Sequence, residues 1–290
     1  MQKLSYLKPA SLQAALAYLN EYGAKCKPYA GGTDLMVQLR EGAPRLRGVE
    51  YLMDVGGLAE LRGIEVRDSE ISIGAMTTHT QVNTSEVLRK HVPFLSIASS
   101  TVGSTQIRNN GTVGGNICNA SPAADTLSPF VALNARLVAV SVNGERRVSL
   151  KDAFVKAGVL KLEPNELVTR IEIDRIDDYA TAFIKLGRRK ALAISRMNAA
   201  VALKMEDGVI QAARIAPGCV FATPDRVEKA EALVVGKAPS AELFEEAGKA
   251  VSEEMVARTG IRWSTEYKKP VIEALIRRAL CRAAGLPEDE

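Results

Sequence analysis

Two glycine-rich stretches of the chain have residue types suited to holding a phosphate group. In the first, "AGGTDL", Gly31 and Gly32 stand between a short apolar run and a helical pattern. Backbone amides at such a bend point outward, and glycine lets a ligand approach the backbone without a Cβ in the way. A plain turn is the alternative, because one Gly-Gly pair is less specific than a dinucleotide or P-loop signature, and the sequence has neither.

The second stretch, residues 100–129, reads "STVGSTQIRNNGTVGGNICNASPAADTLSP" and mixes glycine with asparagine. Both residue types favour turns with exposed amides, so "GTVGGN" could form a nest for a diphosphate. Asp125, at the start of a helical pattern, could accept hydrogen bonds from a polyol. Two facing loops suit a bridging pyrophosphate, whereas the alternative is a long irregular loop around a hairpin.

Few residues of the chain are suited to binding a metal or to acid–base or nucleophilic catalysis. The four cysteines are scattered without a C-x-x-C pair and the chain has two histidines, which argues against a metal site made by this chain alone. No paired carboxylates and no nucleophile–base arrangement stand out. We expect structural roles for His79 and Arg108, although Arg108 could also face a phosphate or a partner subunit. This pattern fits a protein whose chemistry belongs to a cofactor.

Composition narrows the class of protein. With 47% apolar and 25% charged residues the chain is that of an ordinary globular protein, and 290 residues allow two domains. The basic and acidic residues are interspersed and aromatics are few, which argues against nucleic-acid binding. No apolar run approaches the ~20 residues that cross a bilayer, so we expect a cytoplasmic protein.

The elements that must position these stretches follow from the pattern of apolar residues. Residues 1–55 alternate strand and helix patterns, opened by a helix capped at Ser11, and predict a small α/β unit with parallel strands. Residues 56–175 predict mostly antiparallel sheet with helices laid against it, including hairpins at Asp68-Ser69 and Asn143-Gly144.

Beyond about residue 176 the pattern predicts a small sheet and a helical cluster. An Asp207-Gly208 turn joins two alternating strands. Three helices close the chain, at roughly 224–235, 240–257 and 265–283, and the first of them is predicted to begin at Thr223-Pro224 with a cap residue and a proline at N1.

The stretches "AGGTDL", "QIRNNGTVGGNICNASPAAD" and "FIKLGRRKALAISRMNAAVAL" resemble the FAD-binding medium subunit of the molybdenum hydroxylases, xanthine and nicotinate dehydrogenase type, with carbon monoxide dehydrogenase more distant. The resemblance implies an α+β chain, in which a two-subdomain FAD-binding fold of the vanillyl-alcohol oxidase (PCMH) type precedes a C-terminal α+β domain. The implied domains are 1–176, with subdomains 1–55 and 56–176, and 177–290.

The same resemblance implies FAD as the cofactor and assigns binding residues, with no catalytic or metal-binding residue in this chain. Gly103 and Leu167, or its neighbour Val168, would make backbone contacts. Asp125 would hold ribityl or ribose hydroxyls. The residues implied to contact the diphosphate are Tyr29, Ala30, Gly31, Gly32, Thr33, Asp34 and Leu35 in the first loop, and Thr112, Val113, Gly114, Gly115 and Asn116 in the second.

Lys185 is implied to lie at the polar edge of the flavin ring. A cation there would stabilise negative charge on the reduced ring and raise its reduction potential. The alternative is a solvated lysine, since Lys185 belongs to the basic run "KLGRRK".

The implied function is electron transfer. A large molybdopterin subunit would oxidise the substrate, a small subunit with 2Fe–2S clusters would relay electrons, and FAD in this chain would pass them to NAD⁺ or another acceptor. The benzoyl-CoA-reducing branch is disfavoured, because its cysteine-rich insertion is missing. The substrate, the acceptor and the number of copies stay open. A stand-alone FAD-dependent oxidase or reductase is one alternative, and a non-enzymatic nucleotide-binding scaffold is another.

Overall fold

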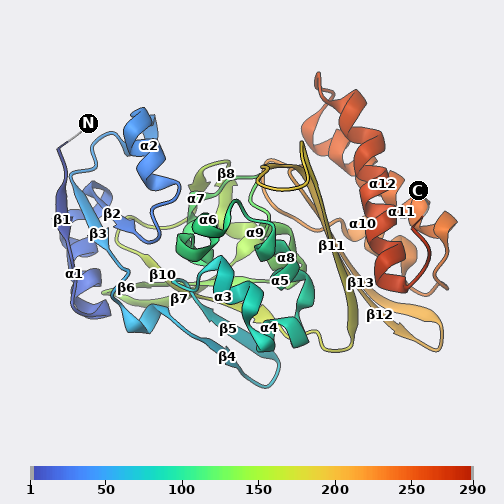
Figure 1. Cartoon of the computed structure of the whole chain (residues 1–290), viewed down its shortest axis with the longest axis horizontal. Coiled ribbons are helices and arrows are strands. Elements are labelled where there is room, and N and C mark those ends of the chain that lie inside the picture. Colours follow the sequence, from blue (N-terminus) through green and yellow to red (C-terminus); the bar gives the residue numbers. More distant parts are fainter. Residues whose placement is uncertain (1–2, 289–290) are drawn as a thin grey trace. The chain divides into compact units, whose positions relative to one another are not determined.

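The computed structural model describes residues 3–288 (Figure 1), and within it the chain folds into two compact units. Unit 1 comprises the chain up to Gln81 together with Ser104–Ala120 and Ala135–Asp174. Unit 2 comprises Val82–Gly103, Ser121–Asn134 and the chain from Arg175 onward. The predicted domain limits at 55 and 176 are a different division and stay predictions.

Unit 1 begins with the predicted parallel α/β arrangement. Strand β3 (Tyr51–Asp54) lies between β1 (Ser5–Leu7) and β2 (Cys26–Tyr29), and both pairings are parallel. Helix α1 (Leu12–Tyr22) starts where predicted, because the Ser11 side chain accepts a hydrogen bond from the amide of Ala14. Its buried face packs with β3 in one apolar cluster.

A five-stranded antiparallel sheet forms the rest of the framework of unit 1, in the order β4-β5-β10-β6-β7. Both predicted hairpins are confirmed, since β4 pairs with β5 and β6 pairs with β7. Gly144 has φ of 125°, which explains why the second turn needs glycine. The strands are β4 (Ile64–Val66), β5 (Glu70–Gly74), β6 (Arg136–Ser141), β7 (Gly144–Ser149) and β10 (Leu167–Asp174).

The asparagine- and glycine-rich stretch contains more helix than the sequence predicted. Helix α6 (Thr105–Asn110) is capped by Ser104, and α7 (Val113–Asn119) is capped by Thr112, whose hydroxyl accepts from the amide of Gly115. The prediction of a loop over "GTVGGN" was therefore wrong from Val113 onward, because two capping hydroxyls outweigh the turn preference of glycine and asparagine.

Short elements complete unit 1. They are α2 (Leu35–Glu41), α9 (Leu150–Ala153), β8 (Phe154–Lys156), β9 (Val159–Leu160) and the 3₁₀ turns Gly23–Lys25, Pro44–Leu46 and Ala59–Leu61, while α3 (His79–Thr84) runs across the division between the units.

Unit 2 is built on the antiparallel sheet β11-β12-β13, formed by Tyr179–Gly187, Ser195–Glu206 and Val209–Gly218. The predicted hairpin between the last two strands is confirmed. Asp207 and Gly208 both have positive φ, 51° and 75°, as a tight two-residue hairpin turn requires.

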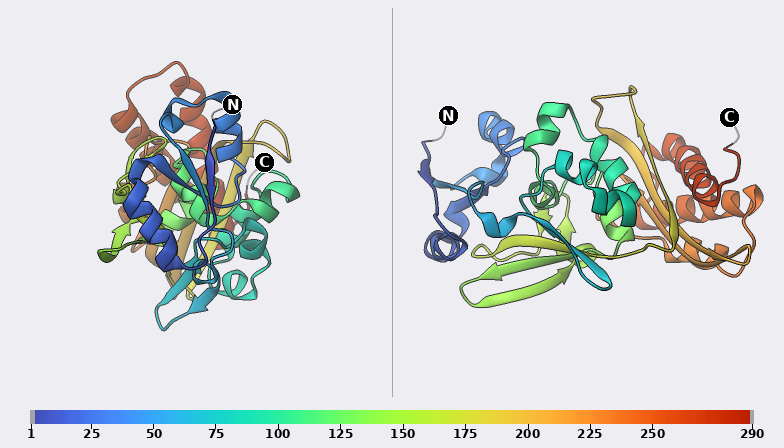
Figure 2. Two further views of the ribbon diagram at one scale, coloured as in Figure 1. Left: turned by 90° about the vertical axis from the view of Figure 1, so that its left-hand side faces the viewer. Right: turned by 60° about the horizontal axis from the view of Figure 1, so that its bottom comes forward.

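Helices cover both faces of this sheet (Figure 2). Met197, Val201 and other alternate residues of β12 join the apolar cluster formed with α10 (Glu228–Val234), α11 (Ala241–Thr259) and α12 (Thr265–Ala284). On the other side, α5 (Pro93–Ser100) packs on β11, and α8 (Leu127–Ala132) packs on β12 and β13. Helix α4 (Glu86–His91) precedes α5 and ends before Pro93, which is the first residue of α5.

The predicted start of the first C-terminal helix was wrong. Helix α10 begins at Glu228, and Pro224 is not its first residue. The amide of Val227 instead donates to the carbonyl of Ile215 at 2.9 Å, and the Val227 side chain is buried. Pairing with β13 and burial of Val227 thus keep this segment extended, which overrides the local helix-start signal.

Among residues 3–288 no helix is long and apolar enough to cross a membrane.

Candidate functional site

The two glycine loops predicted to hold a diphosphate touch each other inside unit 1. A Cβ built on Gly31 would lie 1.8 Å from the carbonyl oxygen of Asn110. A Cβ on Gly111 would lie 3.5 Å from the Thr33 hydroxyl, and one on Gly115 would lie 4.0 Å from Ala30. Glycine at position 31 is therefore required for the contact between the loops.

Gly32 has a different requirement. Its φ is 68°, a conformation that residues with a side chain rarely adopt, and a Cβ there would lie 2.6 Å from the ring of Tyr29. The first loop thus bends sharply beside Tyr29 before α2 begins at Leu35.

Unit 1 fastens the second loop through its backbone. The amide of Val113 donates to Thr77, the amide of Gly114 donates to Ala75, and the carbonyl of Gly111 accepts from the amide of His79, at 2.9–3.0 Å. A Cβ on Gly114 would lie 2.7 Å from Ala75, so this glycine serves the packing of the chain on itself. Contacts from Thr112, Val113, Gly114, Gly115 and Asn116 to a diphosphate stay a prediction.

The first loop keeps its amides available. Within residues 3–288 the N–H groups of Gly31, Gly32, Thr33, Asp34 and Leu35 have no hydrogen-bond partner. All of these residues except Asp34 are half-buried, and amides in such places normally find an acceptor. A run of open donors beside a close backbone contact fits an anionic group such as a diphosphate.

Side chains from α2 and the residues after it hold the end of α7. Gln38 donates to the Asn119 side chain at 3.1 Å, and Arg45 donates to the carbonyl of Asn119 at 3.2 Å. One loop leads into α2 and the other leads into α7. These bonds therefore fix the position of one loop relative to the other.

His79 lies buried against the second loop. Its ring is 3.4 Å from the position of a Cβ on Gly111, and the residue is 2% exposed. Burial, with a smaller contribution from Arg108, lowers the pKa of His79 from its ordinary 6.5 to about 4. The imidazole is therefore neutral near pH 7. Among the described residues its Nδ1 has no hydrogen-bond partner.

Leu167 opens β10 and belongs to the apolar cluster that contains Met76 and against which Ala30 packs. The residue is 6% exposed, and its backbone contact with the cofactor stays a prediction.

Unit 2 brings together Asp125 and Lys185, two predicted cofactor-binding residues that are 60 positions apart in the sequence. Lys185 Nζ lies 2.5 Å from Asp125 Oδ2 and donates to the carbonyl of Thr101 at 2.9 Å. The Lys185 side chain is 11% exposed and the Asp125 side chain is 7% exposed. The alternative that Lys185 is a solvated surface lysine was therefore wrong. Gly103 follows Thr101 by two residues and has φ of 47°. Its backbone contact with the cofactor stays a prediction.

Burial raises the pKa of the Asp125 carboxyl, although hydrogen bonds from Lys185 and Ser195 act in the opposite direction. Ser195 Oγ donates to Asp125 Oδ1 at 2.5 Å. The carboxylate therefore has a partner on each oxygen, and it fixes the position of the Lys185 ammonium.

Sequence reasoning missed Ser195 and the polar residues that extend this cluster. Ser128 and Asn198 are hydrogen-bonded at 2.5 Å, and a Cβ on Gly218 would lie 2.0 Å from Asn198. No sequence signal marks these residues, because they come from α8, β12 and the end of β13. Their pairing depends on how the strands and helices pack.

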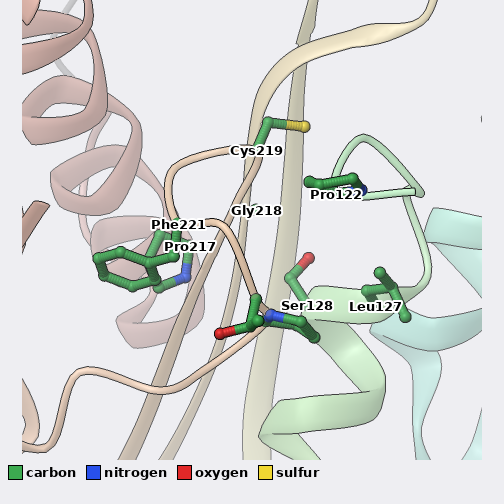
Figure 3. Close-up of a pocket in the computed structure, with 9 residues that line it drawn as sticks. Pro122, Leu127, Ser128, Pro217, Gly218, Cys219 and Phe221 are labelled. Carbon is green, nitrogen blue, oxygen red and sulfur yellow. The ribbon is translucent and has the colours of Figure 1, made fainter. Parts of the chain in front are cut away.

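A pocket lies beside the cluster, between Pro122 and Leu127 on one side and the residues from Pro217 to Pro224 on the other (Figure 3). Cys219 lines it with φ of 63°. Burial and the nearby Asp125 raise the pKa of the Cys219 thiol to about 12, so this cysteine is a poor nucleophile.

Family models account for nearly the whole chain. Residues 2–175 match the FAD binding domain in molybdopterin dehydrogenase, and residues 182–283 match the CO dehydrogenase flavoprotein C-terminal domain. The chain belongs to the FAD-binding medium subunits of the molybdenum hydroxylases. The resemblance noted in the sequence is confirmed, and with it the fold class, the FAD cofactor and the assignment as an oxidoreductase subunit.

Individual relatives extend over the same length. The nicotinate dehydrogenase FAD-subunit of Eubacterium barkeri is 35% identical, and the match covers 96% of this chain and 95% of that protein. The glyceraldehyde dehydrogenase medium chain of Sulfolobus acidocaldarius is 32% identical, with 97% and 99% covered.

Solved structures agree with the fold. A chain of carbon monoxide dehydrogenase from Hydrogenophaga pseudoflava superposes with a TM-score of 0.90 at 29% identity and covers 98% of each chain. Quinoline 2-oxidoreductase from Pseudomonas putida 86 gives a TM-score of 0.89, also at 29% identity and over 98% of each chain.

The buried pair of Asp125 and Lys185 gives a stability prediction for this medium subunit. Replacing Lys185 by Met alone should lower the free energy of unfolding by about 3–5 kcal/mol, because it leaves a buried carboxylate without its cation. The double variant Lys185→Met, Asp125→Asn should regain most of that loss. Chemical denaturation of the three proteins measures both effects, and equal losses in the single and double variants would contradict the coupling.

His79 predicts a pH dependence. Its pKa is lower in the folded chain, so the unfolded chain binds the proton more readily, and the contribution to stability is complete above pH 6.5. As the pH falls from 6.5 to about 4, the free energy of unfolding of the wild-type chain should decrease by about 3 kcal/mol more than that of a His79→Gln variant. Denaturation curves across this range measure the difference. NMR titration, assigned with the help of a His91→Gln variant, should show the His79 ring titrating near pH 4. A midpoint near 6.5 would refute the assignment.

Proposed function

We propose that this FAD-binding medium subunit takes electrons from iron–sulfur clusters of a small partner subunit and passes them to an external acceptor, with NAD⁺ as the first candidate. Bound FAD would supply the exchange between single-electron and two-electron transfer. The observation that carries the proposal is the run of open amides in the first glycine loop, held against the second loop by the Gly31 contact. Those donors suit the FAD diphosphate.

The chain's own residues would bind and orient the cofactor. Gly31 to Leu35 would provide the donors, and the fastened second loop would fix where the diphosphate lies. Gly115 and Asn116 are part of that fastened segment, since their amides donate to the capping residue Thr112.

In unit 2, Lys185 would face the polar edge of the flavin ring and Asp125 the hydroxyls of the cofactor. The ion pair supports these roles, because Asp125 and Thr101 hold the ammonium in one place before a ligand arrives. A cation fixed in a buried site stabilises developing negative charge more strongly than a solvated lysine would.

Partner subunits would supply the remaining chemistry. By analogy with relatives named as medium chains, we place this chain in a cytoplasmic complex with a large molybdopterin subunit and a small subunit carrying 2Fe–2S clusters. Substrate choice would belong to the large subunit. The medium subunit would determine the reduction potential of the flavin and access to the acceptor.

The loop assignment is tested by adding a negative charge. Thr33→Glu places a carboxylate among the open amides and should raise the Kd for FAD about tenfold or more, since like charges would then meet at the diphosphate. Val37→Glu puts the same charge on an exposed position of α2, where Val37 is 47% exposed, and should leave FAD content unchanged. The FAD content of each purified variant, measured as the flavin released on denaturation, distinguishes the two expectations. Equal FAD content in the two variants would show that the first loop does not bind the diphosphate.

Electron transfer is tested in the assembled enzyme under anaerobic conditions. Substrate of the large subunit should bleach the visible flavin absorbance when all three subunits are present. Omitting the small subunit should slow the bleaching by about a hundredfold or more, because direct contact with the electron donor is lost. Equally fast bleaching by the medium subunit alone would instead support the stand-alone oxidase or reductase.

A further inference from the structure

Unit 2 presents apolar side chains to solvent between α11 and α12. Trp263 is 97% exposed and Ile261 is 87% exposed, and Tyr267 in the first turn of α12 is 46% exposed. Single exposed apolar side chains are normal on a protein surface, whereas several that gather in one short segment mark a site of association. We call Arg196, Ile261, Trp263 and Tyr267 the α12 entry surface.

Hydrogen bonds hold this surface in a defined conformation. The amide of Arg262 donates to the Thr265 hydroxyl at 2.8 Å, and the amide of Thr265 donates back to the carbonyl of Arg262 at 2.9 Å. Arg262 Nε also donates to the carbonyl of Thr259. Trp263 is thus presented by an ordered turn, which lowers the entropy lost when a partner covers it.

Positive charge exceeds negative charge around this surface, where the first turn of α12 contributes one carboxylate, Glu266. Arg196 lies over the Tyr267 ring at 5.4 Å, and within residues 3–288 neither it nor Arg262 nor Lys269 forms an ion pair. Arg258 differs, because it is paired with Asp225 and Glu254. An excess of cations around exposed apolar residues fits a partner that has an apolar pocket with an acidic rim.

The position of the surface in unit 2 points to one partner. Arg196 directly follows Ser195, whose hydroxyl bonds Asp125, and Asp125 in turn holds Lys185. The surface and the residues assigned to the flavin therefore lie at the same end of β12, on opposite faces of the sheet. A subunit that delivers electrons must come close to that end of the sheet, whereas a subunit that only binds substrate need not.

We infer that the α12 entry surface is the docking site of the iron–sulfur subunit, which covers Trp263 and Ile261 with an apolar pocket and meets the surrounding cations with carboxylates. This inference rests on the proposed function. A second copy of this chain fits less well, because the unpaired cations would face each other.

The test is the affinity between the purified FAD-loaded medium subunit and the purified iron–sulfur subunit. The double variant Ile261→Ser, Trp263→Ser should raise the Kd about tenfold or more, with FAD content unchanged. Val142→Ser is the matched control, since Val142 is 50% exposed at the β6–β7 turn in unit 1 and should keep the wild-type Kd. A second variant, Arg262→Glu with Lys269→Glu, should weaken binding most at low salt.

Each other outcome overturns the inference. An unchanged Kd for the iron–sulfur subunit, weakened binding of the large subunit instead, or loss only of self-association would assign the surface to another use. Failure of the proposed function is a separate result: the wild-type flavin would then not be reduced in the assembled enzyme, even where the docking variants lower affinity as expected.

Discussion

The contact between the backbone at Gly31 and the carbonyl of Asn110 is the constraint on which the candidate site depends. No side chain larger than hydrogen fits between these atoms, so the two glycine loops meet only with glycine at position 31. The contact sets the first loop beside an anchored second loop and leaves a row of its amides without protein partners among the described residues. A backbone-lined site of this kind binds through the shape and charge of an anion and performs no chemistry of its own.

In unit 1 the candidate binding groups are backbone amides, whereas in unit 2 they are charged side chains. The Lys185 ammonium is held by Asp125, and Asp125 is held by Ser195 from the beginning of β12. Burying this pair is costly unless its hydrogen bonds are satisfied, and here the carboxylate oxygens and the ammonium all have partners. Rigid placement of one cation is what tuning a redox group requires, since its effect depends on distance and on exclusion of water.

Much of the fold followed from local signals in the sequence. Ser11 predicted the start of α1, and Asn143-Gly144 and Asp207-Gly208 predicted hairpins, because capping and positive φ are properties of a few adjacent residues. Local signals failed where distant parts of the chain compete with them. Val227 pairs with Ile215 and delays α10, and the partnership of Asp125 and Lys185 forms only when α8 packs on the sheet of unit 2. The motifs indicated the loops, whereas the reason for each glycine required the packed structure.

The unpartnered amides of residues 31–35 also bear on how the subunit is maintained in a cell. A half-buried donor without an acceptor raises the free energy of the folded chain, and an anion that satisfies several such donors at once lowers it. Cofactor and native structure are then thermodynamically linked, so occupancy shifts the folding equilibrium by mass action. The abundance of this subunit would consequently follow the supply of its flavin nucleotide, and the protein would report on the cofactor pool as well as use it.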